Sequence, residues 1–258
     1  TYYNYPRAYK MIDELQPQAV IFSDGGPGCR WMGNEHGFAG ATNWSFLRTG
    51  EVYPGYPKYR ELQYGHADGN QWVAAECDVS IRPGWFYHPE EDDRVKTVDE
   101  LTDLYYRSVG HNATLLLNFP VDRDGLIHPT DSANAVNFHQ NVQKQLAHNL
   151  LAGLSPKASD ERGRTFSAKA VTDGDYDTYW ATNDDVISAT IEFDLPQAEK
   201  INRMMLQEYI PLGQRVKSFV VEYNQAGEWI PVKLNEETTT IGYKRLLRFE
   251  TITTDKIR

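Results

Sequence analysis

Cysteine is nearly absent from this sequence, and long apolar runs are absent altogether. Only Cys29 and Cys77 occur among the 258 residues, which is too few for a disulfide scaffold and too widely spaced for a metal knuckle. No run of apolar residues approaches the roughly 20 that a membrane-spanning helix needs, and nothing at the start reads as a signal peptide. The sequence therefore excludes a small disulfide-rich protein and predicts no membrane span.

Positive charge is also scarce. The chain has 26 Lys and Arg residues against 36 Asp and Glu residues, which gives a formal net charge of −10. No basic cluster stands out from this acidic background, so nucleic acid is not an expected partner. All seven histidines lie in the first 154 residues, which indicates that the chemistry of the protein belongs to that part.

The pattern of predicted elements changes after Ser155. In residues 1–154, helical and continuous apolar segments alternate, as in a parallel α/β fold. The expected helices are 5–16, 97–109 and about 130–151, and the expected strands are 19–22, 72–80 and 114–119. Residues 155–258 instead show short alternating segments separated by turns, a pattern typical of an antiparallel β-sandwich. These segments are 187–193, 203–207, 218–223, 229–234 and 246–249.

The stretch from Pro27 to Gly37 is the strongest candidate for a functional loop. It follows the apolar run 19–22, and glycines at positions 25, 26, 28 and 33 allow sharp turns and close approach to a ligand. The stretch also carries Arg30, Trp31 and Glu35. A flat apolar ring, a cationic fork and a carboxylate that can give or take a proton suit the cleavage of a sugar. The apolar neighbours of Glu35 predict partial desolvation, which would raise the pKa of its carboxyl group.

Aromatic residues are concentrated in the connection that follows. Ten of them occur between Trp44 and Tyr87, and rigid rings match the apolar faces of sugars at low entropic cost. The alternative is a small hydrophobic core under a long loop. Either interpretation fits any single ring of this group.

Other acidic and histidine residues leave several possibilities open. Asp24, Glu76 and Asp78 lie at or near strand ends and could supply the second carboxylate that a glycosidase needs. Their spacing does not choose among them. The histidines at positions 36, 66 and 88 lack the spacing of a zinc site, so hydrogen bonds to substrate or backbone are the more economical use.

A loop of the second part is rich in oxygen ligands. Asp173, Asp175 and Thr178 surround a glycine turn and could hold a structural Ca²⁺ ion. The pattern is not that of an EF-hand. A turn stabilised by the aspartate side chains alone explains the same residues.

Three ordered motifs resemble a known family. They are Gly26-Pro27 with Arg30-Trp31-Met32-Gly33-Asn34-Glu35, then Ser80-Ile81-Arg82-Pro83-Gly84-Trp85-Phe86-Tyr87-His88, then Ser108-Val109-Gly110-His111-Asn112 with Leu115-Leu116-Leu117-Asn118. This set is similar to the family 29 α-L-fucosidases, and in particular to the branch that acts on α-1,3/1,4-linked fucose. Residues 155–258 resemble the discoidin-like (coagulation factor 5/8 type C) domain.

The resemblance implies that residues 1–154 are the C-terminal part of a (β/α)₈-like catalytic barrel, with a discoidin-like β-sandwich at 155–258. It implies a retaining, double-displacement exo-α-L-fucosidase that needs no cofactor, acts on fucosylated oligosaccharides or glycoconjugates, and has its nucleophile before Thr1 of this chain. Glu35 would be the acid/base, and a secreted or periplasmic location is expected. The expected substrate contacts are Arg30, Trp31, Asn34, Trp85 and His88. Many relatives have Asp where this chain has Gly28, a departure that affects substrate preference.

Two rival functions belong to other classes. A non-catalytic, lectin-like protein would use the aromatic loops and the second domain only to bind glycans, and an intact mass near 29.5 kDa for the native protein would favour it. A metal-dependent hydrolase would lose its activity on exhaustive chelation.

Overall fold

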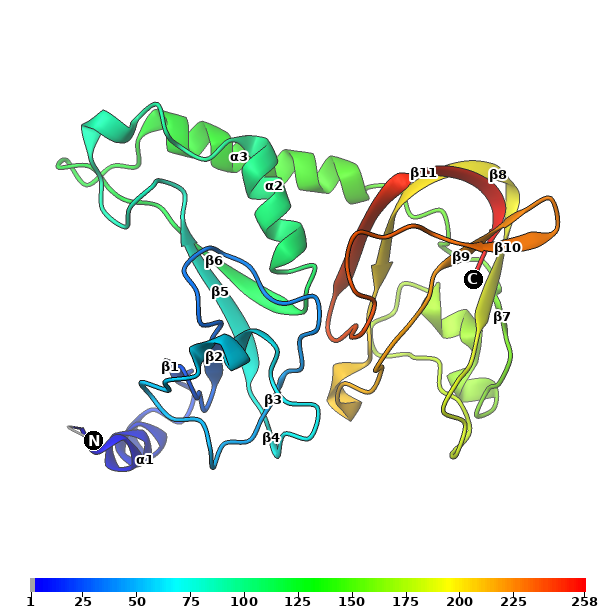
Figure 1. Ribbon diagram of the computed structural model, residues 1–258, viewed down its shortest axis with the longest axis horizontal. Coiled ribbons are helices and arrows are strands. Elements are labelled where there is room, and N and C mark those ends of the chain that lie inside the picture. Colours follow the sequence, from blue (N-terminus) through cyan, green and yellow to red (C-terminus); the bar gives the residue numbers. More distant parts are fainter. Residues whose placement is uncertain (1–2) are drawn as a thin grey trace.

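Two lobes lie side by side in the computed structural model, which describes residues 3–258 (Figure 1). The first lobe contains a parallel sheet and the helices α1 (Tyr5–Leu15), α2 (Val98–Arg107) and α3 (Pro129–Leu146). The second lobe contains an antiparallel sheet that includes the C-terminal strand (Figure 1). No helix within residues 3–258 combines the length and apolar character that crossing a bilayer requires.

The sheet of the first lobe has four parallel strands in the order β1-β2-β5-β6. Their bounds are β1 (Phe22–Ser23), β2 (Cys29–Trp31), β5 (Ala74–Ser80) and β6 (Ala113–Asn118). This arrangement confirms the parallel α/β pattern expected from the sequence. Within the described residues the sheet is open, with β1 and β6 at its two edges.

The sequence predictions for the first strand and for the long connection after it were partly wrong. The segment 19–22 was expected to be buried on both faces, but β1 is an edge strand in which Phe22 is 46% exposed, and nearby Val20 is 75% exposed. The connection 25–71 is not a continuous loop. It contains β2, the 3₁₀ helix Tyr59–Gln63, and β3 (Phe46–Leu47), which pairs with β4 (Gln71–Trp72). Strands of two or three residues are too short to show a period in the sequence.

The two faces of the parallel sheet differ in chemistry. Val79, Leu115 and Leu117 point toward α2 and α3 and join the hydrophobic core between sheet and helices. Trp31, Glu76 and Thr114, which pair in register across β2, β5 and β6, point to the opposite face. The helix-covered face therefore provides stability, and the opposite face is free to carry polar chemistry.

Local signals set the limits of the helices. The sequence expectation for α2 is confirmed in detail, because Thr97 caps the helix and exchanges hydrogen bonds with Glu100 in a capping box. Helix α3 ends at Leu146 rather than near residue 151. The leucines at positions 150, 151 and 154 pack instead into the core of the second lobe, so burial of these side chains ends the helix early.

The second lobe is built on one five-stranded antiparallel sheet in the order β10-β9-β11-β8-β7. Its strands are β7 (Lys157–Ala158), β8 (Ile191–Leu206), β9 (Glu222–Gln225), β10 (Glu228–Pro231) and β11 (Arg245–Ile257). The antiparallel class is confirmed. Two expected segments, 187–193 and 203–207, contribute to the single long strand β8, because its pairing with β11 continues across a bulge. All the strands assigned to this lobe in the described chain belong to this one sheet. The β-sandwich expected from the sequence has two sheets.

Candidate active site

The site candidates come from two neighbouring parallel strands. Strand β2 ends at Trp31 and is followed by the loop that carries Glu35, and β5 ends at Ser80 and is followed by the loop that carries Trp85. Carboxyl ends of parallel strands meet at one edge of a sheet, where α/β proteins bind ligands. Tertiary pairing therefore brings together residues that are 50 positions apart.

Glu35 and Trp85 are in direct contact. The indole Nε1 of Trp85 donates a hydrogen bond of 2.9 Å to Oε2 of Glu35. Trp85 is half-buried, whereas Glu35 is exposed, so the desolvation expected for this carboxylate is not found in the described chain. The physical reason is that its neighbours Met32 and Gly33 are buried in the fold and do not enclose it. The indole orients one carboxylate oxygen, while the side chain stays open to a ligand.

A second indole–carboxylate pair lies beside the first. Nε1 of Trp31 donates to Oδ1 of Asp78 at 2.9 Å. Burial raises the pKa of Asp78, and the charge of Glu35 raises it further, which shows that the two carboxylates lie within electrostatic reach of each other. The sequence had left Asp78 as one of three equal candidates, and the structure gives it a specific partner.

Glu76 lies two residues before Asp78 on the same face of β5. Burial raises its pKa, and the charge of Asp78 adds to that shift. One of its oxygens, Oε1, is buried without a hydrogen-bond partner in the described chain. Asp24, the third candidate, uses its Oδ2 atom to accept a hydrogen bond of 2.6 Å from the Gly55 amide, so it orders a loop.

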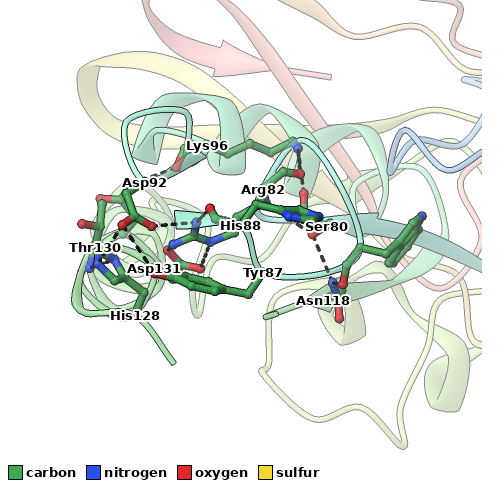
Figure 2. A network of polar contacts seen from close by, with 12 residues as sticks. Ser80, Arg82, Tyr87, His88, Asp92, Lys96, Asn118, His128, Thr130 and Asp131 are labelled. Atoms are coloured by element: carbon green, nitrogen blue, oxygen red, sulfur yellow. Dashed lines mark hydrogen bonds and ion pairs between the residues drawn. The ribbon is translucent and has the colours of Figure 1, made fainter. Parts of the chain in front are cut away.

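The loop that carries Trp85 is held by a buried ionic network centred on Arg82 (Figure 2). Arg82 donates to both oxygens of Asp131, at 2.8 and 2.9 Å, and the side chains of both residues are fully buried. It also pairs with Asp92 at 2.9 Å and lies over the ring of Tyr87. Lys96 closes the same loop by donating to the Ser80 carbonyl at 2.7 Å, and burial lowers the pKa of this lysine.

A second contact ties Trp85 to the sheet. Asn118, at the end of β6, donates to the carbonyl of Trp85 and to Oγ of Ser80, each at 3.1 Å (Figure 2). Asn118 is opposite Ser80 in the register of β5 and β6. The position of Trp85 therefore depends on β5, on β6 and on α3, which contributes Asp131.

Two expected substrate contacts, Arg30 and Asn34, have other roles in the structure. Arg30 is completely buried and donates to the carbonyls of Leu62 and Val73 and to the side chain of Asn43. The expectation of a sugar contact at Arg30 is wrong for this structure, because its side chain points into the core of the lobe. Asn34 shapes its own loop by donating to the Phe38 carbonyl at 3.0 Å and accepting from the His36 amide.

The histidines do not come together. His88 is exposed, and only its backbone carbonyl joins the Arg82 network (Figure 2). His66 is buried and accepts a hydrogen bond from the Arg48 amide, whereas His36 is exposed and stacks on Phe38. Across residues 3–258, no group of three or more His, Cys, Asp or Glu side chains is arranged to hold a metal ion.

The aspartate loop of the second lobe forms a hydrogen-bonded turn. Asp173 accepts from the Asp175 amide at 2.9 Å and from Oγ1 of Thr178 at 2.8 Å, and Asp175 accepts from the Asp177 amide at 2.9 Å. These bonds lower the pKa of Asp173. These bonds are those expected of a turn stabilised by aspartate side chains. Calcium in this loop stays a prediction.

Two cavities of the described chain lie away from Glu35. An apolar groove of about 690 Å³ lies between α2, α3 and β6, and a polar pocket of about 360 Å³ is lined by residues of both lobes, including His111 and Glu236. Glu35 lines neither of them.

Sequence reasoning missed the residues that support the site. Arg82 was noted only within a motif, and Asp131, Asn118 and Asn43 were given no role. Each is a single polar residue in or beside an apolar element, a weak signal, and its partner is 13 to 49 positions away. Such pairings depend on strand register and cannot be identified from spacing.

Comparisons with known proteins agree with this description. The sequence model of the F5/8 type C domain matches residues 155–258. Alpha-L-fucosidase 1 of Arabidopsis thaliana is 39% identical over 251 residues, which is 93% of this chain and 48% of that protein. The chain thus spans about half the length of this curated relative.

Solved structures match over a similar share. One from Bacteroides thetaiotaomicron has a TM-score of 0.92 at 40% identity and covers 98% of this chain and 56% of that chain. A glycoside hydrolase family 29 fucosidase of Ruminococcus gnavus, solved in complex with fucose, has a TM-score of 0.88 at 32% identity and covers 99% of this chain and 53% of its own. Over nearly its whole length, this chain therefore shares sequence and fold with the family 29 α-L-fucosidases, and its residues 155–258 form an F5/8 type C domain.

Proposed function

We propose that the protein of which this chain is a part is a retaining exo-α-L-fucosidase that releases terminal α-1,3/1,4-linked fucose from oligosaccharides or glycoconjugates. The observation that carries the proposal is the exposed Glu35 carboxylate, oriented by Trp85 at the carboxyl edge of a parallel sheet. The similarity to a family 29 fucosidase in complex with fucose supports the substrate. We further propose that the four parallel strands are part of a (β/α)₈-like barrel, with Trp31, Glu76 and Asp78 on its inner face.

In this proposal Glu35 is the general acid and base. Its proton goes to the glycosidic oxygen of the departing sugar while a carboxylate outside the described residues attacks the anomeric carbon. Glu35 then takes a proton from the water that hydrolyses the glycosyl–enzyme intermediate, which restores both carboxyl groups and retains the anomeric configuration. The hydrogen bond from Trp85 keeps one oxygen of Glu35 in place, so that the other can face the glycosidic bond. No cofactor is needed for these steps, and a secreted or periplasmic location remains a prediction.

The acid/base assignment is tested by Glu35→Gln in the complete protein. We expect a loss of about 10²- to 10⁴-fold on a fucosylated oligosaccharide and a much smaller loss on an aryl fucoside, because an activated leaving group departs without a proton. Glu14→Gln, on the surface of α1, is the matched control and should change neither rate. Equal losses on both substrates would remove Glu35 from this role.

Retention is tested separately on the wild-type protein. The first product seen by NMR should be α-L-fucose, which then mutarotates. A first product in the β form would reject the double displacement. Binding of the oligosaccharide without turnover would favour the lectin-like alternative.

A further inference from the structure

The two lobes are joined by a buried polar cluster. The first lobe contributes Asn43, Ser45 and Asn112, and the second contributes Gln214, Thr240 and Arg245. Every one of these residues is less than 10% exposed. Buried polar groups are costly unless they are paired, so the geometry of this cluster is tightly determined.

Gln214 makes the central contacts of the cluster. Its Nε2 donates to the Asn43 carbonyl at 2.8 Å, and its Oε1 accepts from the Ser45 amide at 3.0 Å. Thr240 accepts from the Asn43 amide at 2.9 Å. The backbone of residue 43 is therefore held from both sides by the second lobe.

The side chain of Asn43 contacts Arg30, which lies on the strand that precedes the Glu35 loop. Its Oδ1 accepts a hydrogen bond of 2.7 Å from Nη2 of Arg30, and its Nδ2 donates to the His111 and Asn112 carbonyls. The other two recorded acceptors of Arg30 are backbone carbonyls, so Asn43 is the one side chain among them. Arg30 is a fully buried cation, and burial lowers its pKa to about 10. If Asn43 is displaced, the buried guanidinium of Arg30 loses an acceptor and has to shift to find another.

Arg30 is the residue next to Trp31 on β2. Any movement of Arg30 is carried by the backbone to Trp31, whose indole meets Asp78, and onward to the loop of Glu35. Hydrogen bonds thus link the F5/8 type C domain to Arg30, and the backbone of β2 continues from Arg30 through Trp31 into the acid/base loop.

We propose that the F5/8 type C domain positions the acid/base loop of the first lobe through Gln214, Asn43 and Arg30. This inference rests on the proposed function and adds to it: the second domain is part of the catalytic scaffold, and Gln214 and Asn43 are positioning residues that do not touch the substrate. A misplacement of about 1 Å at a catalytic group can cost about 100-fold in rate, so a small adjustment of β2 is enough to be measured.

The test compares three variants of the second domain in the complete protein. Gln214→Ala removes the contacts with Asn43, Ser45 and Asn112. Gln214→Glu keeps the acceptor for Ser45 but loses the donor to Asn43. Gln197→Ala, at an exposed position of β8, is the matched control. The values of kcat and KM are measured for an oligosaccharide and for an aryl fucoside, well below the melting temperature of each variant.

We expect Gln214→Ala to lower kcat on the oligosaccharide by about 10-fold or more, with a smaller change on the aryl fucoside and little change in KM. Gln214→Glu should show the same split, and the control should match wild type. A variant that melts at lower temperature but keeps wild-type kcat on both substrates would overturn the inference. If neither Gln214 variant folds, Thr240→Val removes the hydroxyl that accepts from the Asn43 amide and donates to the Ala41 carbonyl. This variant keeps the side-chain shape and is judged by the same criterion. An inactive wild type would instead overturn the proposed function and this inference with it.

Discussion

The buried pair of Arg82 and Asp131 provides the sharpest test of how the Trp85 loop is held. Both side chains are completely buried and meet through two parallel hydrogen bonds of 2.8 and 2.9 Å. Asp131→Asn keeps the shape of the side chain but removes its charge. The new amide NH₂ group then faces an N–H donor of Arg82 in place of an acceptor oxygen. Breaking one partner of a buried pair costs about 3–5 kcal/mol. Because Asp92 still compensates part of the charge of Arg82, we expect about 3 kcal/mol.

The chain contains a matched control for this experiment. Arg48 and Asp68 form a similar two-bond contact, at 2.9 and 3.1 Å, but their side chains are 43% and 68% exposed. Asp68→Asn makes the same chemical change in water, where a salt bridge contributes about 0–1 kcal/mol. The free energies of unfolding of the two variants, measured by urea denaturation of the complete protein, should therefore differ by about 2 kcal/mol or more.

A double variant extends the test. Arg82→Met with Asp131→Leu removes both charges, and it should be less destabilising than the sum of the two single changes, because no uncompensated buried charge remains. Equal losses for Asp131→Asn and Asp68→Asn would refute the reasoning, as would strict additivity in the double variant. Asp131→Asn should also lower activity, since the same network positions the loop of Trp85.

Three further outcomes are expected. Burial and the charge of Asp78 raise the pKa of Glu76 above its ordinary value of 4.5. The protonated side chain therefore stabilises the folded state fully below pH 4.5, and this stabilisation is lost as the pH rises through the raised pKa. Glu76→Gln should thus become more stable relative to wild type between pH 4 and pH 7, and a stability difference that does not change with pH would contradict this. Thr97→Ala should cost about 1 kcal/mol of unfolding free energy through loss of the α2 cap, whereas Thr97→Ser should retain most of it. If Asp173 holds a calcium ion, chelation should lower the melting temperature of wild type but not that of Asp173→Asn. Identical melting temperatures with and without chelator would support a turn without calcium.

The carboxylates of the two indole–carboxylate contacts at the sheet edge differ in their exposure to solvent. Trp85 reaches an exposed carboxylate that a ligand can approach, and Trp31 reaches a carboxylate whose pKa burial raises. Rings held by hydrogen bonds at their nitrogen atoms lose little entropy when a sugar packs against them. This arrangement fits a site that is rigid before the substrate arrives.

Local features of the sequence were enough to predict most of the regular elements. The capping box at Thr97, the apolar run of β6 and the helical spacing of α1 depend on residues within a few positions of one another, and each element was found near its expected place. The change of pattern after Ser155 likewise predicted the antiparallel class of the second lobe. Glu35 was singled out because a glycine-rich loop after a strand is recognisable without a structure, whereas Trp85 was named as a substrate contact through the family resemblance.

The sequence by itself determined most of the longer elements, the parallel α/β and antiparallel β classes of the two parts, and the resemblance to the family, since these rest on short-range patterns and ordered motifs. Only the tertiary structure decided that Arg30 belongs to the core, that Trp31 contacts Asp78, and that Gln214 of the second lobe holds Asn43 of the first. The physical reason is the same in each case. A hydrogen bond between residues tens to hundreds of positions apart depends on strand register and domain packing, which the whole chain sets together.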